Sequence, residues 1–237
     1  MSRVAGAGAA GERTRLSPVQ KMTIDRLREG REGSVPVTIA AEARADALLA
    51  ARRRAHEAGQ TNVTVTALLA FAVVRALIEH PALNAALIDE SILRYADVNL
   101  GLAVALPDDN LVVPVIRRAQ YLSLPELGAA IADLAERGRT RRLGIDDVKG
   151  GTFTLSSTGF VALPVFGTPL LTPGQSGIVL VGAAAQKPVA VAGRLEIASV
   201  VPVSLTFDHT VVNGVPALRF LAELVDRIER AGSWTVR

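Results

Sequence analysis

Apolar residues recur at the three- and four-residue spacing of a helix face in several segments of the chain. A first helix is predicted to begin at Ser17 and Pro18, because serine favours the N-cap and proline the first helical turn. We expect 64–79, the most apolar segment, to be buried, and the arginines 52–54 to lie on an exposed helix face. The other predicted helices cover residues 44–58, 64–79, about 124–138 and 216–229.

Short apolar runs between these segments predict strands. They cover residues 35–43, 151–156, 178–182 and 201–207, and two more lie within 98–116. We expect a turn at 107–110 (P-D-D-N) to join the two strands within 98–116, and a hairpin turn at 191–194. Because helices and strands alternate without a linker-like break after residue 14, we expect one α/β domain with a mixed sheet over residues 15–237.

Residues 1–14 are small and polar and show no apolar periodicity, so we expect them to form a flexible tail. Gly6, Gly8 and Gly11 in this segment fit G-x-G-x-x-G, which cradles a pyrophosphate when it lies between a strand and a helix. Only five residues precede Gly6, too few for that strand. We therefore assign no dinucleotide site here.

Composition narrows the classes of protein that fit this pattern. Of the 237 residues 49% are apolar and 21% are charged, which allows a sizeable core and argues against disorder. The net charge of +3 is small, and no apolar run reaches the roughly 20 residues of a membrane span. Cysteine is absent, and the three histidines show no metal-ligand spacing. We expect a cytoplasmic protein with no metal and no nucleic-acid or membrane partner.

His209 is the first candidate for chemistry, because it lies between a predicted strand and the last predicted helix. It belongs to the sequence D-H-T-V-V-N-G at 208–214. A histidine at such a junction can project its ring into a cleft and act as a general base. The spacing alone leaves open a packed histidine that caps the helix.

The second candidate is the segment G-G-T-F-T-L-S-S-T-G at 150–159, a predicted strand that ends in three hydroxyl side chains. Hydroxyl groups there can donate a hydrogen bond to the oxyanion that develops in a transition state. A serine-rich turn without a chemical role is the alternative. The pattern G-x-S-x-G, typical of hydrolase nucleophiles, does not occur in the sequence.

Five segments in order along the chain carry a family resemblance. They are L-S-P-V-Q-K (16–21), H-P-A-L-N-A (80–85), N-L-V-V-P-V-I (110–116), D-D-V-K-G-G-T-F-T-L-S-S (146–157) and D-H-T-V-V-N-G (208–214). Together they resemble the catalytic domain of the 2-oxoacid dehydrogenase acyltransferases, the dihydrolipoyl acyltransferases, from about Leu16 to Arg230. The resemblance implies a chloramphenicol acetyltransferase-like two-layer α/β sandwich with a mixed β-sheet, assembled as a homotrimer with active sites between subunits.

The same resemblance implies roles for three residues. His209 would be the general base that takes the proton from the acceptor. Ser156 would donate its hydroxyl to the tetrahedral oxyanion from the neighbouring subunit, and Asn213 would support the histidine loop. The implied reaction is direct transfer in a ternary complex with acetyl-CoA as the donor substrate; no residue is assigned to coenzyme A binding.

Two positions depart from the family pattern. Thr210 and Gln20 stand where the family usually has arginine. Because Gln20 and Asn213 are both uncharged, we expect a neutral hydrogen bond between Gln20 and the 209–214 loop in place of an ion pair.

The acyl acceptor is the open question from sequence alone. We find no lipoyl or subunit-binding domain and expect no covalently bound lipoyl group in this chain. Our main hypothesis is therefore acetyl transfer to a hydroxyl of a small molecule, as in stand-alone proteins of tetronate antibiotic biosynthesis. The first alternative is a dihydrolipoamide acyltransferase component of a 2-oxoacid dehydrogenase complex, which would take a carrier-bound acceptor. The second is a non-catalytic scaffold or binding module with the same fold.

The end of the chain, A-G-S-W-T-V-R at 231–237, leads to an expectation about assembly. Gly232 and Ser233 end the last helix, and Arg237 places charge at a terminus that would be costly to bury. We expect a free trimer of roughly 75 kDa, three times the 24.9 kDa chain, rather than a larger core.

Overall fold

The computed structural model describes residues 15–106 and 110–234. The predicted tail over 1–14 and most of the predicted turn at 107–110 lie outside the described residues. The predicted helices are confirmed, with ends that differ by no more than about two residues. The described α-helices are α1 (Pro18–Glu32), α2 (Asp46–Glu57), α3 (Val65–Glu79), α4 (Leu124–Arg139) and α5 (Gly214–Glu229).

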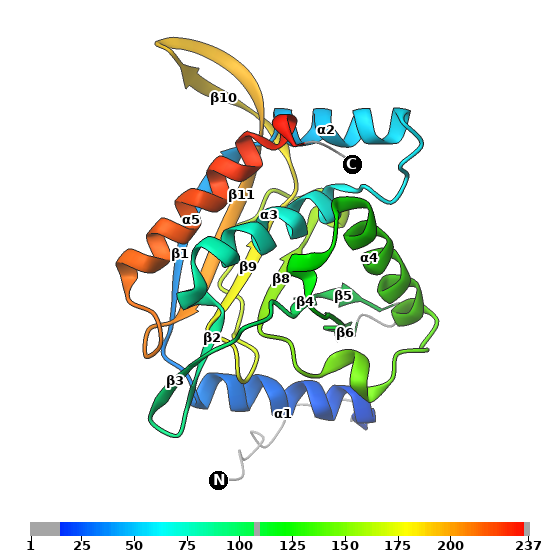
Figure 1. Ribbon diagram of the computed structural model, residues 1–237, viewed down its shortest axis with the longest axis vertical. Coiled ribbons are helices and arrows are strands. Elements are labelled where there is room, and N and C mark those ends of the chain that lie inside the picture. Colours follow the sequence, from blue (N-terminus) through cyan, green and yellow to red (C-terminus); the bar gives the residue numbers. More distant parts are fainter. Residues whose placement is uncertain (1–14, 107–109, 235–237) are drawn as a thin grey trace, which may run out of the picture.

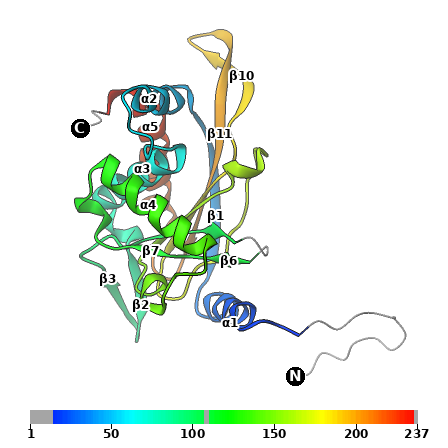
Figure 2. The same cartoon turned by 90° about the vertical axis from the view of Figure 1, so that its right-hand side faces the viewer.

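A mixed sheet lies at the centre of the molecule (Figure 1). Its order is β1 (Pro36–Arg44), β11 (Arg194–Asp208), β9 (Gly177–Val181), β8 (Phe153–Ser157), β4 (Leu100–Leu102) and β7 (Val115–Ile116), with β10 (Ala185–Val191) also paired to β11. β8 is parallel to both β9 and β4, and the other pairs are antiparallel. Helices α2, α3, α4 and α5 cover one side of the sheet, which gives the expected two-layer sandwich (Figure 2).

Alternation of side chains along the strands separates the core from the opposite face of the sheet. On β8, Phe153 and Leu155 are fully buried on the helix side, where α3 packs against the strand. Thr154 and Ser156 therefore point to the other face. The prediction that the segment 64–79 is buried is confirmed, because α3 places a run of alanine, leucine and valine in the core.

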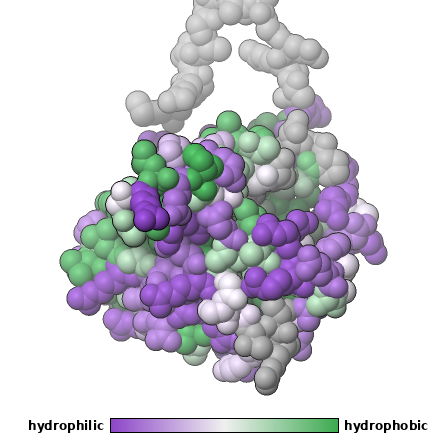
Figure 3. Space-filling view, turned by 90° about the horizontal axis from the view of Figure 1, so that it is seen from above, coloured by the Kyte–Doolittle hydropathy of each residue, from purple (hydrophilic) through white to green (hydrophobic). Residues whose placement is uncertain are grey.

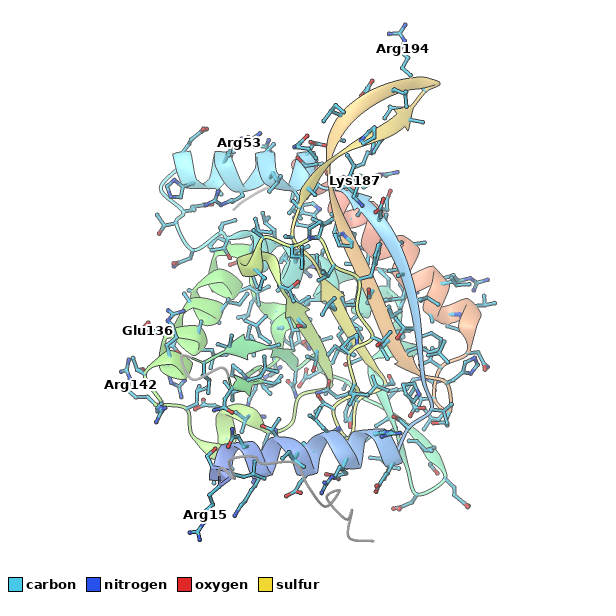
Figure 4. All side chains as sticks on the ribbon, turned by 180° about the vertical axis from the view of Figure 1, so that it is seen from behind. Arg15, Arg53, Glu136, Arg142, Lys187 and Arg194 are labelled. Carbon is cyan, nitrogen blue, oxygen red and sulfur yellow. The ribbon has the colours of Figure 1, made fainter. Side chains whose placement is uncertain are left out.

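The first and second helices follow their sequence signals. The Ser17 hydroxyl accepts a hydrogen bond from the Gln20 N–H at 3.2 Å, as predicted for the N-cap of α1. The arginines at 52–54 on α2 are all exposed, as predicted, and Figure 4 shows Arg53 on the outer side of α2.

The segment 98–116 differs from the prediction of two strands, because each is interrupted. β4 pairs with β7, and the short β5 (Val104–Ala105) pairs with β6 (Leu111–Val112). Pro114 lies between β6 and β7; its carbonyl accepts a hydrogen bond from the Leu102 N–H at 2.9 Å. Since proline has no N–H with which to donate a hydrogen bond to the neighbouring strand, the hydrogen-bonded strand pairing is interrupted at Pro114.

A second hairpin, β2 (Ala85–Ile88) with β3 (Ser91–Arg94), was not predicted. Its turn is formed by Asp89 and Glu90, which both have positive φ, 44° and 61°. Such turns usually contain glycine or asparagine, so this sequence lacks the ordinary hairpin signal.

β11 is much longer than the predicted strand 201–207, and its first half extends beyond the sheet with β10 as a two-stranded arm (Figure 1). The predicted turn at 191–194 is confirmed by positive φ at Ala192 and Gly193. On one face of the arm Leu195 is 83% exposed and Ile197 is 70% exposed. Green apolar side chains stand among purple polar ones at this end of the molecule, and Arg194 points away from the arm (Figures 3 and 4).

Helix α1 lies across the opposite end of the sheet, and Gly30 sets how closely it approaches (Figure 1). A Cβ atom at Gly30 would lie 2.2 Å from the carbonyl oxygen of Leu171, which is backbone and cannot rotate away. We expect Gly30→Ala to lower the free energy of unfolding by about 1–3 kcal/mol, measured by chemical denaturation.

Gly214 is the matched control, because a Cβ there would meet no atom within 4 Å. Gly214→Ala should leave the free energy of unfolding unchanged or raise it by about 0.4–1 kcal/mol. Equal stability of the two variants would contradict the close packing of α1 at Gly30.

Candidate active site

His209 is placed by the end of β11 and by the segment that joins α1 to β1. Its backbone N–H donates a hydrogen bond to the carbonyl of Val35 at 2.9 Å. The ring lies 5.6 Å from the ring of Phe207, centroid to centroid, and the residue is exposed. The N-cap of α5 is Asn213, not His209, so the alternative of a packed, helix-capping histidine is wrong.

Asp208 holds the turn that carries His209. It is only 4% exposed, and its Oδ1 atom accepts three hydrogen bonds. The donors are the N–H of Val35 at 3.1 Å, the N–H of Thr210 at 3.0 Å and the hydroxyl of Thr210 at 2.8 Å. A buried carboxylate needs such donors, and here they join the start of β1 to the residue after His209.

Thr210 thus supplies uncharged donors to Asp208 at the position where the family pattern has arginine. Within the described residues Asp208 forms no ion pair, and both donors of Thr210 bind its Oδ1 atom. Sequence reasoning did not identify Asp208 as part of the site. An acidic residue directly after the apolar run of β11 was the available signal.

Asn213 lies four residues after His209 and is exposed, and its side chain makes no capping hydrogen bond to α5. The predicted bond between Gln20 and the 209–214 loop is not formed in this chain. Instead Oε1 of Gln20 accepts a hydrogen bond from the Ser17 N–H at 2.8 Å, as part of a capping box. Gln20 lies about 18 Å along α1 from Glu32, near which the helix approaches the histidine turn.

Ser156 lies near the end of β8, on the sheet face opposite the helices, and is half-buried. Its hydroxyl has no hydrogen-bond partner within residues 15–106 and 110–234. An unused donor at a strand end is what a site for an oxyanion requires.

The sheet register separates Ser156 from His209 within one chain. Ser156 is paired with Leu180, and Leu180 with Ser204, so Ser156 and Ser204 are two strands apart, about 10 Å. His209 follows Ser204 by five residues, the first four of them in β11, which places it about 16 Å further along the strand direction. The resulting distance of about 19 Å is too long for one substrate carbonyl to contact both side chains.

The segment before β8 is anchored by charged groups. Asp147 accepts a hydrogen bond from the Gly144 N–H at 2.7 Å and forms an ion pair with Arg137. The Gly144 N–H, followed by the Arg137 guanidinium, lowers the pKa of the Asp147 carboxyl below its ordinary value. Arg117 donates to the carbonyl of Lys149 at 3.3 Å, which fixes the chain as it enters β8.

Two kinds of site are not found in the part of the chain that the structure describes. No group of three or more histidine, aspartate or glutamate side chains is arranged to hold a metal ion there. In the same residues no helix has the length and apolar character needed to cross a membrane.

The comparison with known families decides the identity of this domain. Residues 8–236 match the family of 2-oxoacid dehydrogenases acyltransferase (catalytic domain). The chain belongs to this family. The acyltransferase resemblance inferred from five short segments is thereby confirmed over nearly the whole chain.

Curated relatives of this acyltransferase are longer proteins. This chain is 35% identical over 218 residues to the dihydrolipoyllysine-residue acetyltransferase component of the acetoin cleaving system of Bacillus subtilis. The match covers 90% of this chain and 54% of that protein. This chain is 32% identical over 232 residues to the human mitochondrial succinyltransferase component of the 2-oxoglutarate dehydrogenase complex, covering 95% and 51%. The chain therefore spans about half the length of these relatives.

Solved structures confirm the fold of the acyltransferase domain. The Azotobacter vinelandii dihydrolipoamide acetyltransferase superposes with a TM-score of 0.87 at 31% identity, covering 94% of this chain and 93% of that chain. That structure was determined to investigate the role of one serine, one histidine and one asparagine in the catalytic mechanism of the Azotobacter enzyme. Chloramphenicol acetyltransferase, at 17% identity, a TM-score of 0.55, and coverage of 86% and 94%, shares the fold.

Removal of the Asp208 carboxylate tests the clamp on the histidine turn. We expect Asp208→Ala to lower the free energy of unfolding by about 1–3 kcal/mol, because three part-buried hydrogen bonds from Val35 and Thr210 lose their acceptor. Thr210→Val, which removes one donor, should lower it by about 0.5–1.5 kcal/mol. Thr210→Ser keeps the hydroxyl and serves as the control; urea denaturation of the three variants should rank them in that order.

Proposed function

We propose that the chain catalyses acetyl transfer between coenzyme A and a lipoyl thiol, as the catalytic domain of a dihydrolipoamide acyltransferase. Membership of the acyltransferase family carries this proposal. The relatives described above act, by their names, on dihydrolipoyllysine residues, and the one with 35% identity is an acetyltransferase. This support favours the lipoyl acceptor, our first alternative, over the hydroxyl of a tetronate intermediate, which the names of these relatives do not mention. The acceptor is then carried by a lipoyl group on a partner domain or chain.

Three side chains carry the proposed chemistry: His209, Ser156 and Asn213. In the Azotobacter enzyme the investigated asparagine follows the investigated histidine by four residues, the spacing of His209 and Asn213 here. The investigated serine precedes that histidine by 52 residues, and Ser156 precedes His209 by 53. The near-equal spacing supports the assignment of these three residues to the site.

The reaction follows from the two functional groups. The imidazole of His209 accepts the proton of the attacking lipoyl thiol, and the sulfur adds to the carbonyl carbon of the acetyl thioester. The carbonyl oxygen becomes an oxyanion that accepts a hydrogen bond from the Ser156 hydroxyl. When the intermediate collapses, the carbon–sulfur bond to coenzyme A breaks, and the leaving thiolate takes the proton from His209. No acyl-enzyme forms, and acetyl-CoA is consumed as a substrate.

This chemistry requires two copies of the chain, because about 19 Å separates Ser156 from His209 in one copy. We infer that His209 of one subunit meets Ser156 of the next around a closed trimer. The exposed apolar face of the β10–β11 arm, with Leu195 and Ile197, provides surface for such a contact. Residues 235–237, part of the segment from which a free trimer was predicted, lie outside the described residues.

The direct test is an assay of acetyl transfer from acetyl-CoA to dihydrolipoamide, in which the release of coenzyme A is measured. His209→Ala should lower kcat by about 10²–10⁴, the usual contribution of a general base. Its affinity for acetyl-CoA, measured by calorimetry, should change little. Transfer by the wild type to primary alcohols but not to dihydrolipoamide would restore the hydroxyl hypothesis. Absence of both reactions would favour the second alternative, a non-catalytic scaffold or binding module.

Ser157 is a matched control for Ser156, because it is the next residue on the same strand and points to the other face. Ser156→Ala should lower kcat by about 10²–10³, which corresponds to the loss of one oxyanion donor. Ser157→Ala should have a much smaller effect. The reverse order would show that the oxyanion donor is assigned to the wrong serine.

Mixed oligomers test whether the site is shared. His209→Ala and Ser156→Ala chains, each with strongly lowered kcat alone, should regain activity when they are co-expressed and assemble together. In a trimer with random assortment about a quarter of the sites would combine an intact His209 with an intact Ser156. Light scattering should show the trimer as the smallest active species. Mixed oligomers without regained activity would contradict a shared site.

A further inference from the structure

A cleft of about 280 Å³ lies beside α1, away from both His209 and Ser156. Its walls come from one face of α1, from the segment 111–115, from the loop 148–151 and from residues 170–175. Gly30 brings the end of α1 into close contact with Leu171, and the cleft lies along the middle of the helix, from Met22 to Glu29. The volume is near the lower end of the range for small-molecule sites.

Most of the cleft wall is apolar. It includes the aliphatic side chains Met22, Leu27, Val112, Val115, Leu170 and Pro173. Met22 and Leu27 are exposed in the chain, so a ligand with an apolar body would remove them from water.

Two cations line this apolar cleft without a partner. Arg26 is half-buried on α1, and Lys149 is exposed on the loop before β8. Neither side chain forms a hydrogen bond or an ion pair within residues 15–106 and 110–234. Glu29 is the single carboxylate in the wall, which leaves a net charge of +1. A half-buried guanidinium beside apolar walls favours an anionic partner.

The loop adds two backbone donors. The carbonyl of Lys149 accepts a hydrogen bond from Arg117, and the carbonyl of Gly150 accepts one from Asn99 at 3.0 Å. Because N–H and C=O point in opposite directions across a trans peptide, the N–H groups of Gly150 and Gly151 point away from those partners. Within the described part of the chain both N–H groups lack an acceptor.

We propose that this cleft binds a small monocarboxylate with an apolar chain, such as a medium-chain fatty acid. The net charge of +1 matches one carboxylate, which Arg26, Lys149 and the loop N–H groups would hold, and the aliphatic wall matches the chain. The site does not rest on the proposed acyl transfer, because neither His209 nor Ser156 lines the cleft.

Calorimetric titration of the full chain with octanoate tests the proposal, with octanol, acetate and inorganic phosphate as comparison ligands. We expect saturable octanoate binding that exceeds the affinity for octanol, acetate and phosphate by at least about tenfold, a difference that one charge-assisted contact supplies. Octanol that binds as tightly as octanoate would overturn the proposal that the cleft recognises an anion. Phosphate that binds more tightly than octanoate would overturn the proposal that it recognises an apolar chain.

Matched arginine variants on α1 localise the binding. Arg26→Met should weaken octanoate binding by about tenfold or more, since it removes the charged donor but keeps a long side chain. Arg28→Met is the control, because Arg28 is exposed on the same helix and does not line the cleft. If Arg26→Met fails to fold, Lys149→Met on the exposed loop replaces it. Equal binding by the cleft variant and the control would overturn the proposal.

Discussion

The pairing register of β8, β9 and β11 places Ser156 and His209 about 19 Å apart on one sheet. Neither residue can be moved closer without breaking the hydrogen-bonded ladders or turning core side chains such as Leu155 and Leu205 toward the wrong face. The two groups that the proposed chemistry needs therefore have to come from different subunits. In the proposed mechanism, the geometry of a single sheet thus links catalysis to assembly.

The histidine turn depends on a second, more local constraint. Asp208 is buried at the end of β11 and binds donors from both Val35 and Thr210. A carboxylate with three donors needs no cation nearby, so threonine suffices where the family pattern has arginine. The connection between α1 and β1 thereby contributes to the position of His209, although 173 residues separate Val35 from Asp208.

Helices were predicted more accurately than strands, and particular residues explain the difference. The capping box at Ser17 and the apolar face of α3 are local signals that need no knowledge of the fold. The break beside Pro114 and the hairpin turn at Asp89 and Glu90 depend on partner strands, which the sequence pattern does not show. The proposed bond of Gln20 to the histidine loop failed for the same reason, because a family pattern carries no distances.

The sequence by itself determined the helices, the α/β class, the family and the candidate pair His209 and Ser156, because periodicity and short motifs are local properties of the chain. The family resemblance already implied a serine from the neighbouring subunit, and the tertiary structure supplied the distance that separates this pair within one chain. It also decided that Asp208 supports the histidine turn and that Arg26 faces an apolar cleft. These features arise from contacts between residues far apart in sequence, whose register and distance are set only when the sheet assembles.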